Sequence, residues 1–138
     1  MDGVEYERKA HDWAEIKYNC KLIKKTWRVA GGSKKIIPDF SSDNSECVLG
    51  DAKAGSGLDD ANLRQAGYSV LKMLVIERDR VQQQCKKFLV FENKEKGMKF
   101  RNSMEGALVL IHLLEPDSFE IWYWNGNDDE ERLYPLSS

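Results

Sequence analysis

The order of helical and strand-like segments is the feature of this sequence that most restricts its fold. Apolar residues at helical spacing predict helices, and short apolar runs between turn residues predict strands. The predicted segments are, in order, a helix at 2–18, strands at 21–29, 35–40 and 46–53, a long helix at 59–79, a strand at 87–92, a helix at 104–114 and a strand at 119–124. Glycine-rich and polar turns separate them, as at Gly31-Gly32-Ser33 and residues 41–45.

This order predicts a layered α/β protein. Three consecutive strands can pair as a meander, and the long helix can cross over to return the fourth strand parallel to one of them. We therefore expect a small mixed β-sheet flanked by helices, with an αβββαβ core at about residues 2–92 and a C-terminal helix and strand within 100–125. A chain of 138 residues is long enough for one core, so we expect a single domain over residues 1–138.

Composition bounds the setting in which such a chain works. Hydrophobic residues make up 41% of the chain and charged residues 32%, as is typical of a soluble globular domain. No apolar run approaches the roughly 20 residues that a membrane span requires. The start, Met1-Asp2-Gly3, has neither the basic residues nor the apolar run of a secretory signal. We expect a cytoplasmic site of action, whether the chain acts alone or as a piece of a larger protein, and no membrane partner.

The three cysteines do not predict a disulfide framework. Cys20, Cys47 and Cys85 are far apart in the sequence, and no CxxC pair is present. With only two histidines in the chain, they also make a poor zinc set. We expect buried, reduced thiols.

The net charge of −2 conceals an uneven distribution of charge. Residues 16–38 contain no acid, and a second basic run covers residues 86–101, while acids gather at 128–131. Because local basic density decides phosphate binding, this pattern predicts a partner that is a polyanion, such as DNA or RNA. The candidate nucleic-acid-binding residues are Lys24, Lys25, Lys34, Lys35 and Lys72.

Two acids and a lysine form the candidate site. Asp39 follows Pro38 at the end of one predicted strand, and Asp51 lies near the end of the next, two residues before Lys53. Asp51 and Lys53 share a strand face, and Asp39 can converge on them only where the two strands bend or splay. Two carboxylates with retained waters suit Mg²⁺ or Mn²⁺, and a lysine can neutralise a phosphate beside the ion. The alternative is a solvated pair of surface charges.

The pattern Pro38-Asp39 … Asp51-Ala52-Lys53 resembles the PD-(D/E)xK signature of restriction-endonuclease-like nucleases. The predicted αβββαβ order is similar to that family's core, so the resemblance covers about two thirds of the chain. It implies Mg²⁺-dependent (or Mn²⁺-dependent) phosphodiester hydrolysis by an endonuclease. In this scheme Asp39 and Asp51 hold the metal, and Lys53 is the catalytic lysine.

The resemblance also implies two further catalytic candidates. Many members carry a Glu on the first helix, for which Glu7 is the best match because it borders the apolar stripe. Many carry a QxxxY pair on the helix after the lysine, where this chain has Gln65-Ala66-Gly67-Tyr68, one residue shorter. Gln65 is therefore the second candidate. The segment 37–73 also resembles nuclease domains of bacterial competition toxins, which implies a cognate inhibitor protein as partner.

Three functions are consistent with these features. A nuclease is favoured, with DNA slightly preferred to tRNA or other RNA. A catalytically inactive nucleic-acid-binding module would keep the fold and the basic surface. A cytoplasmic protein-interaction factor, of phage or immunity type, would instead use the acidic segment 128–131 and the aromatic strand Trp122-Tyr123-Trp124. The sequence does not predict an oligomeric state.

Overall fold

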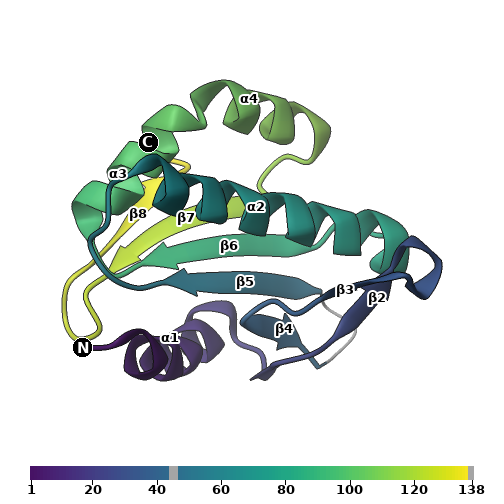
Figure 1. Ribbon diagram of the computed structural model, residues 1–138, viewed down its shortest axis with the longest axis horizontal. Coiled ribbons are helices and arrows are strands. Elements are labelled where there is room, and N and C mark those ends of the chain that lie inside the picture. Colours follow the sequence, from purple (N-terminus) through teal and green to yellow (C-terminus); the bar gives the residue numbers. More distant parts are fainter. Residues whose placement is uncertain (44–46, 137–138) are drawn as a thin grey trace.

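The computed structural model describes residues 1–43 and 47–136, which form an α/β protein with a mixed six-stranded sheet and helices packed on it (Figure 1). The helices in these residues are α1 (Gly3–Tyr18), α2 (Asp60–Ile76), α3 (Lys94–Ser103) and α4 (Glu105–Leu114). The sheet strands are β1 (Leu22–Ile23), β4 (Phe40–Ser42), β5 (Val48–Lys53), β6 (Lys86–Phe91), β7 (Phe119–Trp124) and β8 (Glu130–Tyr134). A separate hairpin contains β2 (Trp27–Val29) and β3 (Lys34–Ile36).

The sheet is parallel at its centre and antiparallel at its edges. Its order is β1-β4-β5-β6-β7-β8, with β5, β6 and β7 parallel and the remaining neighbours antiparallel. The parallel strands need crossover connections, which α2 supplies between β5 and β6 and the α3–α4 pair supplies between β6 and β7. The predicted mixed sheet with helices on both faces is thus confirmed.

Helix α1 covers one face of the sheet (Figure 1). Asp2 caps it by accepting a hydrogen bond from the Glu5 amide at 2.8 Å, and Asn19 ends it in the left-handed conformation, with φ of 50°. The buried stripe of α1 packs on the sheet from β1 and β4 across β5 to β6 and β7; its members are Tyr6, Ala10, Trp13 and Ala14. This packing sets the position of the neighbouring polar residues of α1.

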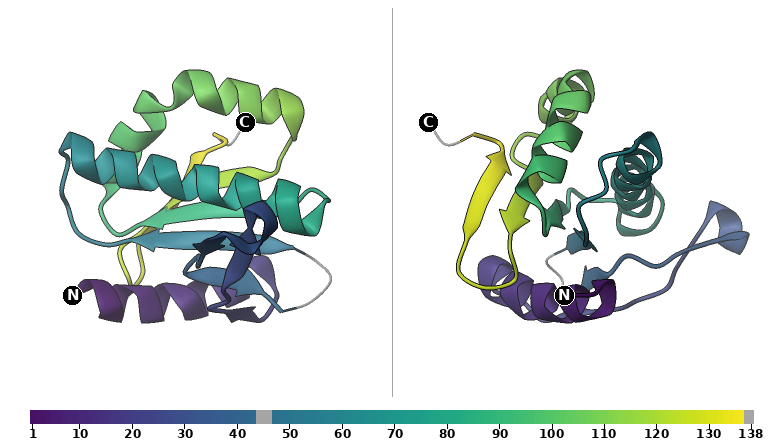
Figure 2. Two further views of the ribbon diagram at one scale, coloured as in Figure 1. Left: turned by 45° about the vertical axis from the view of Figure 1, so that its right-hand side comes forward. Right: turned by 60° about the vertical axis from the view of Figure 1, so that its left-hand side comes forward.

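Helices α2, α3 and α4 lie on the opposite side of the sheet (Figure 2). Val70, Met73 and Ile76 of α2 pack over the central strands in a core that also holds Leu89 and Ile121. Strand β6 is buried on both faces, as its continuous apolar run from Phe88 to Phe91 favours. After α2 the chain continues in a π-helical turn, Glu77–Val81.

Several elements differ from the predicted ones. The strand predicted at 21–29 is two short strands in different sheets, and the segment 35–40 is divided between β3 and β4 around Pro38, whose ring removes a backbone donor. Helix α3 and strand β8 were missed. Strand β4 occupies part of the turn predicted at 41–45, whose residues 44 and 45 lie outside the described part, as does residue 46 of the predicted third strand.

The expectation of three reduced thiols is wrong for two of them. Cys47 and Cys85 form a disulfide that joins the beginnings of β5 and β6, with the Cα atoms 4.6 Å apart. The parallel register pairs Val48 with Lys86, so the preceding residue of each strand is brought to its counterpart. The sequence separation of 38 residues concealed this pairing. Cys20 takes no part in this disulfide.

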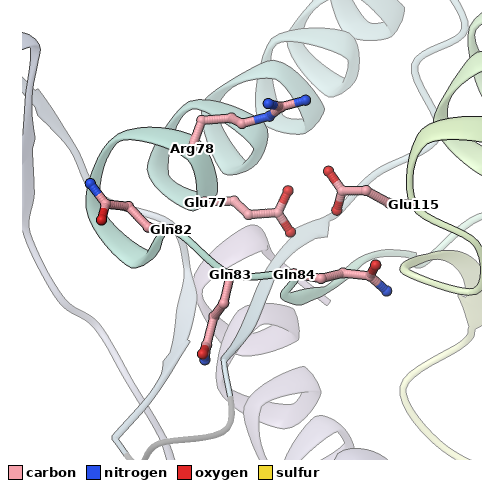
Figure 3. Close-up of a pocket in the computed structure, with 6 residues that line it drawn as sticks. All are labelled: Glu77, Arg78, Gln82, Gln83, Gln84 and Glu115. Atoms are coloured by element: carbon pink, nitrogen blue, oxygen red, sulfur yellow. The ribbon is translucent and has the colours of Figure 1, made fainter.

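A buried lysine joins the end of α2 to the connection between α4 and β7. Lys87 is 1% exposed, and its Nζ atom donates to Glu77 Oε2 at 2.5 Å, to Glu115 Oε1 at 2.9 Å and to the Cys85 carbonyl at 2.8 Å. The carboxylates of Glu77 and Glu115 face one another at the pocket beside Arg78 (Figure 3). Burial, and then the hydrogen bond with Glu115, raises the pKa of Glu77. Lys87 therefore does not belong to a solvated basic surface.

Within residues 1–43 and 47–136, no helix is both long and apolar enough to cross a bilayer.

Candidate functional site

Asp39 and Asp51 lie opposite each other where β4 and β5 stop pairing. The last paired residues of the ladder are Phe40 and Gly50, so the next position on each strand brings the two acids together. Asp39 donates its backbone amide to Asp51 Oδ1 at 2.7 Å, and the Ala52 amide donates to Asp39 Oδ2 at 2.8 Å. Carboxylates thus replace backbone carbonyls as acceptors, and the strands splay here as the convergence of the two acids requires.

Helix α1 brings a third carboxylate to this point. Glu7 lies one turn after the capped start of α1 and shares a hydrogen bond with the Asp39 carboxyl group, which lowers the pKa of Glu7. Lys24 Nζ donates to Glu7 Oε1 at 3.2 Å. Glu7, Lys24 and Asp39 line one side of a cavity of about 410 Å³ that also borders Arg8.

Asp39 is the group most perturbed by this arrangement. Burial raises the pKa of Asp39 to about 8, with further contributions from the hydrogen bond to Glu7 and the charge of Asp51. Without a cation, the carboxyl group of Asp39 therefore holds a proton near neutral pH and donates it toward Glu7. Such a proton marks a place where negative charge is concentrated and where a bound cation would relieve the repulsion.

Lys53 supplies the positive charge beside the acids. Its Nζ atom lies 3.7 Å from Asp51 Oδ2, and the side chains of Lys53 and Asp51 are 20% and 15% exposed. Two residues apart on β5, they share a strand face, whereas the intervening Ala52 packs on the α1 side. The sheet therefore holds an ammonium and a carboxylate together at a partly solvated position.

The arrangement fits a divalent cation through two carboxylates and water. Asp39 Oδ2 and Asp51 Oδ1 accept backbone amides, which orients both carboxylate groups. Asp51 Oδ2 lies 3.7 Å from Lys53 Nζ, and the Asp39 carboxyl group also shares a hydrogen bond with Glu7, so a cation would compete with these two contacts. Mg²⁺ commonly binds through one or two carboxylates and retains several waters. In the described part of the chain, only His11, Asp12 and Glu15 place three ligand atoms within 4.8 Å of one another, and that surface group on α1 is not evidence of a metal site.

The remaining predicted residues lie at varying distances from this cluster. Gln65 and Lys72 are exposed on α2, and among the described residues no hydrogen bond joins the Gln65 side chain to Asp39, Asp51 or Lys53. Lys34 and Lys35 are exposed on β3. The hairpin formed by β2 and β3 projects from the edge of the fold (Figure 1).

Lys25 and Lys24 are held by neighbouring side chains. Lys25 Nζ lies over the Trp27 ring, 4.1 Å from its centroid, and Lys24 pairs with Glu7. Only Lys24, of the predicted phosphate-binding lysines, contacts a residue of the acidic cluster directly within the described chain. Lys25, Lys34 and Lys35 would meet a polyanion further from the reacting group.

A lysine that the sequence analysis placed in the basic run at 86–101 lies next to the site. Lys96, on α3, is 4% exposed, and its Nζ atom donates to the Ala54 carbonyl at 3.0 Å and to Asn62 Oδ1 at 3.2 Å. Burial, and then the charge of Lys53, lowers the pKa of Lys96. Lys96 thus fixes the chain directly after Lys53. The sequence feature that could have placed Lys96 on a helix is Asn93. Its side chain accepts a hydrogen bond from the Lys96 amide and caps the start of α3.

Comparison of the chain with protein-family models, with curated proteins and with solved structures finds no match.

Proposed function

We propose that this protein is a Mg²⁺- or Mn²⁺-dependent endonuclease that hydrolyses phosphodiester bonds, with DNA preferred to tRNA or other RNA. One observation carries the proposal: Asp39 and Asp51 oppose each other at splayed strand ends, and Glu7 and Lys53 contact them from α1 and from the same strand. The sequence pattern supplies these residue types in the order of the PD-(D/E)xK signature. The order of α1, β4, β5, α2 and β6 is compatible with a restriction-endonuclease-like core.

Each side chain has a chemical role in this proposal. A divalent ion held by Asp39 and Asp51 would stabilise negative charge at phosphorus and acidify a bound water. Lys53, beside Asp51, neutralises a phosphate oxygen or orients the attacking water. In the metal-free protein Glu7 accepts a hydrogen bond from the protonated Asp39 carboxyl group. Binding of the ion by Asp39 would release that proton. Gln65 lies on α2, outside these contacts, and its participation depends on the bound substrate.

The basic residues suit a phosphate backbone. Lys34 and Lys35 are exposed on the projecting hairpin, and Lys24 and Arg8 line the cavity beside Asp39. Contacts of this kind bind nucleic acid without reading its sequence and weaken as salt rises. Lys72 on α2 would meet the substrate on the other side of the sheet. A toxin domain with a cognate inhibitor protein is the biological setting that we propose for such an activity.

The test is cleavage by the wild-type chain of plasmid DNA and, separately, of total RNA, with Mg²⁺, with Mn²⁺ and with EDTA. We expect cleavage that requires the metal and falls by orders of magnitude in Asp51→Asn and in Lys53→Met, because each variant removes charge stabilisation in the transition state. Asp12→Asn is the matched control: the Asp12 side chain is 72% exposed on α1, and its carboxylate pairs with His11.

The outcomes separate the three functions. Folded wild type that leaves DNA and RNA intact with both metals contradicts the nuclease. Binding without cleavage, weakened by Lys34→Gln together with Lys35→Gln and by added salt, selects an inactive nucleic-acid-binding module. Neither binding nor cleavage selects the protein-interaction factor. Cleavage that survives in Lys53→Met but not in Asp51→Asn would remove Lys53 from the mechanism and leave the metal site in place.

A further inference from the structure

Helix α4 exposes an apolar stripe that its own chain does not cover. Of its ten residues only Leu108 is buried, although the helix is the most apolar in the described chain. The exposed large side chains of α4 are Val109 at 56%, Leu110 at 62%, Leu113 at 71% and Leu114 at 71%. The helix lies at the outside of the fold (Figure 1), so these side chains face solvent in the single chain.

The stripe has the spacing of a helix-packing face. Val109, Leu110 and Leu113 lie three, four and seven residues after Gly106, which places all four on one arc of the helix. A side chain at Gly106 would meet no atom within 4 Å, so internal packing does not require this glycine. Gly106 therefore leaves room on this face of α4 for a side chain from outside the chain.

The apolar surface continues beyond α4. Leu136, 70% exposed, lines a cavity of about 500 Å³ together with Val109 and Leu113. The five exposed side chains keep 56–71% of their surface in solvent and form a patch of several hundred Å², against the roughly 800 Å² that each partner buries in a standard protein interface. A patch of this size is at the upper limit of what monomeric proteins expose. The rest of such an interface would come from the polar side chains that surround the apolar patch.

We propose that a second copy of this chain covers the stripe, with α4 packed antiparallel against α4 across a twofold axis near Val109 and Leu110. This arrangement is self-complementary. Gly106 of each copy then faces the Leu113–Leu114 end of the other helix and makes room for those side chains. Glu105 and His112 lie on the same edge of the stripe at opposite ends, so the axis brings Glu105 of each copy close to the partner's His112.

The size of the apolar patch and the pairing of Glu105 with His112 argue for a second copy, and the antiparallel arrangement has two further consequences. Antiparallel helices place the positive end of one helix dipole beside the negative end of the other, which a parallel pair does not. The contact is isologous, so it closes as a dimer and leaves no complementary patch for further growth. The dimer does not depend on the proposed nuclease activity, because the candidate site lies at β4, β5 and α1.

Sedimentation velocity over a range of protein concentrations tests the dimer directly. We expect the wild-type chain to sediment as a dimer whose fraction falls on dilution, and Leu110→Glu to weaken association at least about tenfold, because it places two carboxylates at the axis. Ile16→Glu is the matched control: Ile16 is 83% exposed on α1, across the sheet, and the variant should dimerise as the wild type does. Circular dichroism should show the same helix content in both variants.

A cysteine placed at the axis tests whether α4 of one copy packs against α4 of the other near Leu110. In a Cys20→Ser background, oxidation of Leu110→Cys should give a covalent dimer, whereas Ile16→Cys should stay monomeric on a denaturing gel. A wild-type chain that stays monomeric at the highest concentration overturns the proposal, as does Leu110→Glu that dimerises normally. Open-ended larger species from the wild type also overturn it, because an isologous contact cannot propagate.

Discussion

The carboxyl group of Asp39 makes two hydrogen bonds of different kinds, one with a backbone amide and one with the side chain of Glu7. Asp39 Oδ2 accepts the Ala52 amide, and the protonated group donates toward Glu7. An asparagine can make both contacts without titrating, since its Oδ1 atom accepts and its Nδ2 atom donates. The proposed metal requires Asp39 to be ionised, whereas the metal-free fold is more stable when Asp39 is uncharged.

We expect Asp39→Asn to stabilise the metal-free protein increasingly as pH rises. The pKa of Asp39 is about 8 in the folded chain against an ordinary value of 3.8, so near neutral pH the folded state holds a proton that the unfolded state has lost. Stability from this group is present below the unfolded pKa and is lost as pH rises through the folded pKa. At about pH 8.5 the variant should be more stable by several kcal/mol, because the folded and unfolded pKa values lie about four pH units apart and each pH unit corresponds to about 1.4 kcal/mol.

Urea unfolding in EDTA measures this difference. The comparison belongs above about pH 5, because the lowered pKa of Glu7 acts in the opposite sense in acid. Asp12→Asn controls for the removal of one negative charge from the neighbouring helix. Parallel pH profiles of wild type and Asp39→Asn would show that no proton is shared between Asp39 and Glu7.

Lys87 gives a second prediction at the scale of one residue. Lys87→Met leaves the carboxylates of Glu77 and Glu115 facing each other without a cation, so we expect a loss of about 3–5 kcal/mol in the free energy of unfolding. Lys86→Met is the matched control: Lys86 is 34% exposed and should cost less than about 1 kcal/mol. Adding Glu77→Gln to Lys87→Met should recover part of the loss. Equal effects of Lys86→Met and Lys87→Met in denaturant titrations would contradict the buried cluster.

At the scale of elements, the splay of β4 and β5 depends on close packing under the site. Gly50, the residue before Asp51, pairs with Phe40 on β4 and lies against the Phe88 ring of β6. A methyl group at residue 50 would overlap that ring. The glycine thus allows three strands to come together where the two acids project.

Two glycine substitutions should therefore have opposite signs. Gly50→Ala should destabilise the protein by about 1–3 kcal/mol, because Phe88 and the strands must shift. Gly67→Ala, on α2 with no atom within 4 Å of the added carbon, should stabilise it by about 0.5–1 kcal/mol through helix propensity. Thermal unfolding of both variants provides the check. A neutral Gly50→Ala would mean that β6 yields freely and does not constrain the site.

At the scale of the whole molecule, periodicity predicted the layers but not the pairings. The stripe of α1 and the apolar run of β6 are strong signals, because each reflects burial of a continuous face. Helix α3 has few apolar residues and many charges, so its sequence resembled a solvated loop until its packing on β6 and β7 was known. The disulfide of Cys47 and Cys85 follows from the parallel register, which no local pattern encodes.

The same distinction applies to the candidate site. Asp39, Asp51 and Lys53 could be selected from the sequence because strand alternation and a motif relate them. Their mutual hydrogen bonds depend on where the β4–β5 ladder ends, and Glu7 depends on the rotation of α1 against the sheet. Lys87 and Lys96 were placed in a basic surface run, yet both are buried, because a lysine's surroundings are set by tertiary packing.

At the ends of β4 and β5, side-chain carboxylates take the place of backbone carbonyls as hydrogen-bond acceptors. The amides that donate to them can therefore report on ligand binding at the site. The amides of Asp39 and Ala52 are protected only while Asp51 and Asp39 accept them. A ligand that binds those carboxylates weakens their hydrogen bonds to the two amides and changes the hydrogen-exchange rates of these amides. The amides of the β4–β5 ladder from Phe40 onward keep their partners and serve as an internal reference. Hydrogen–deuterium exchange at the amides of Asp39 and Ala52 would therefore report that a ligand occupies the site, even before the ligand is identified.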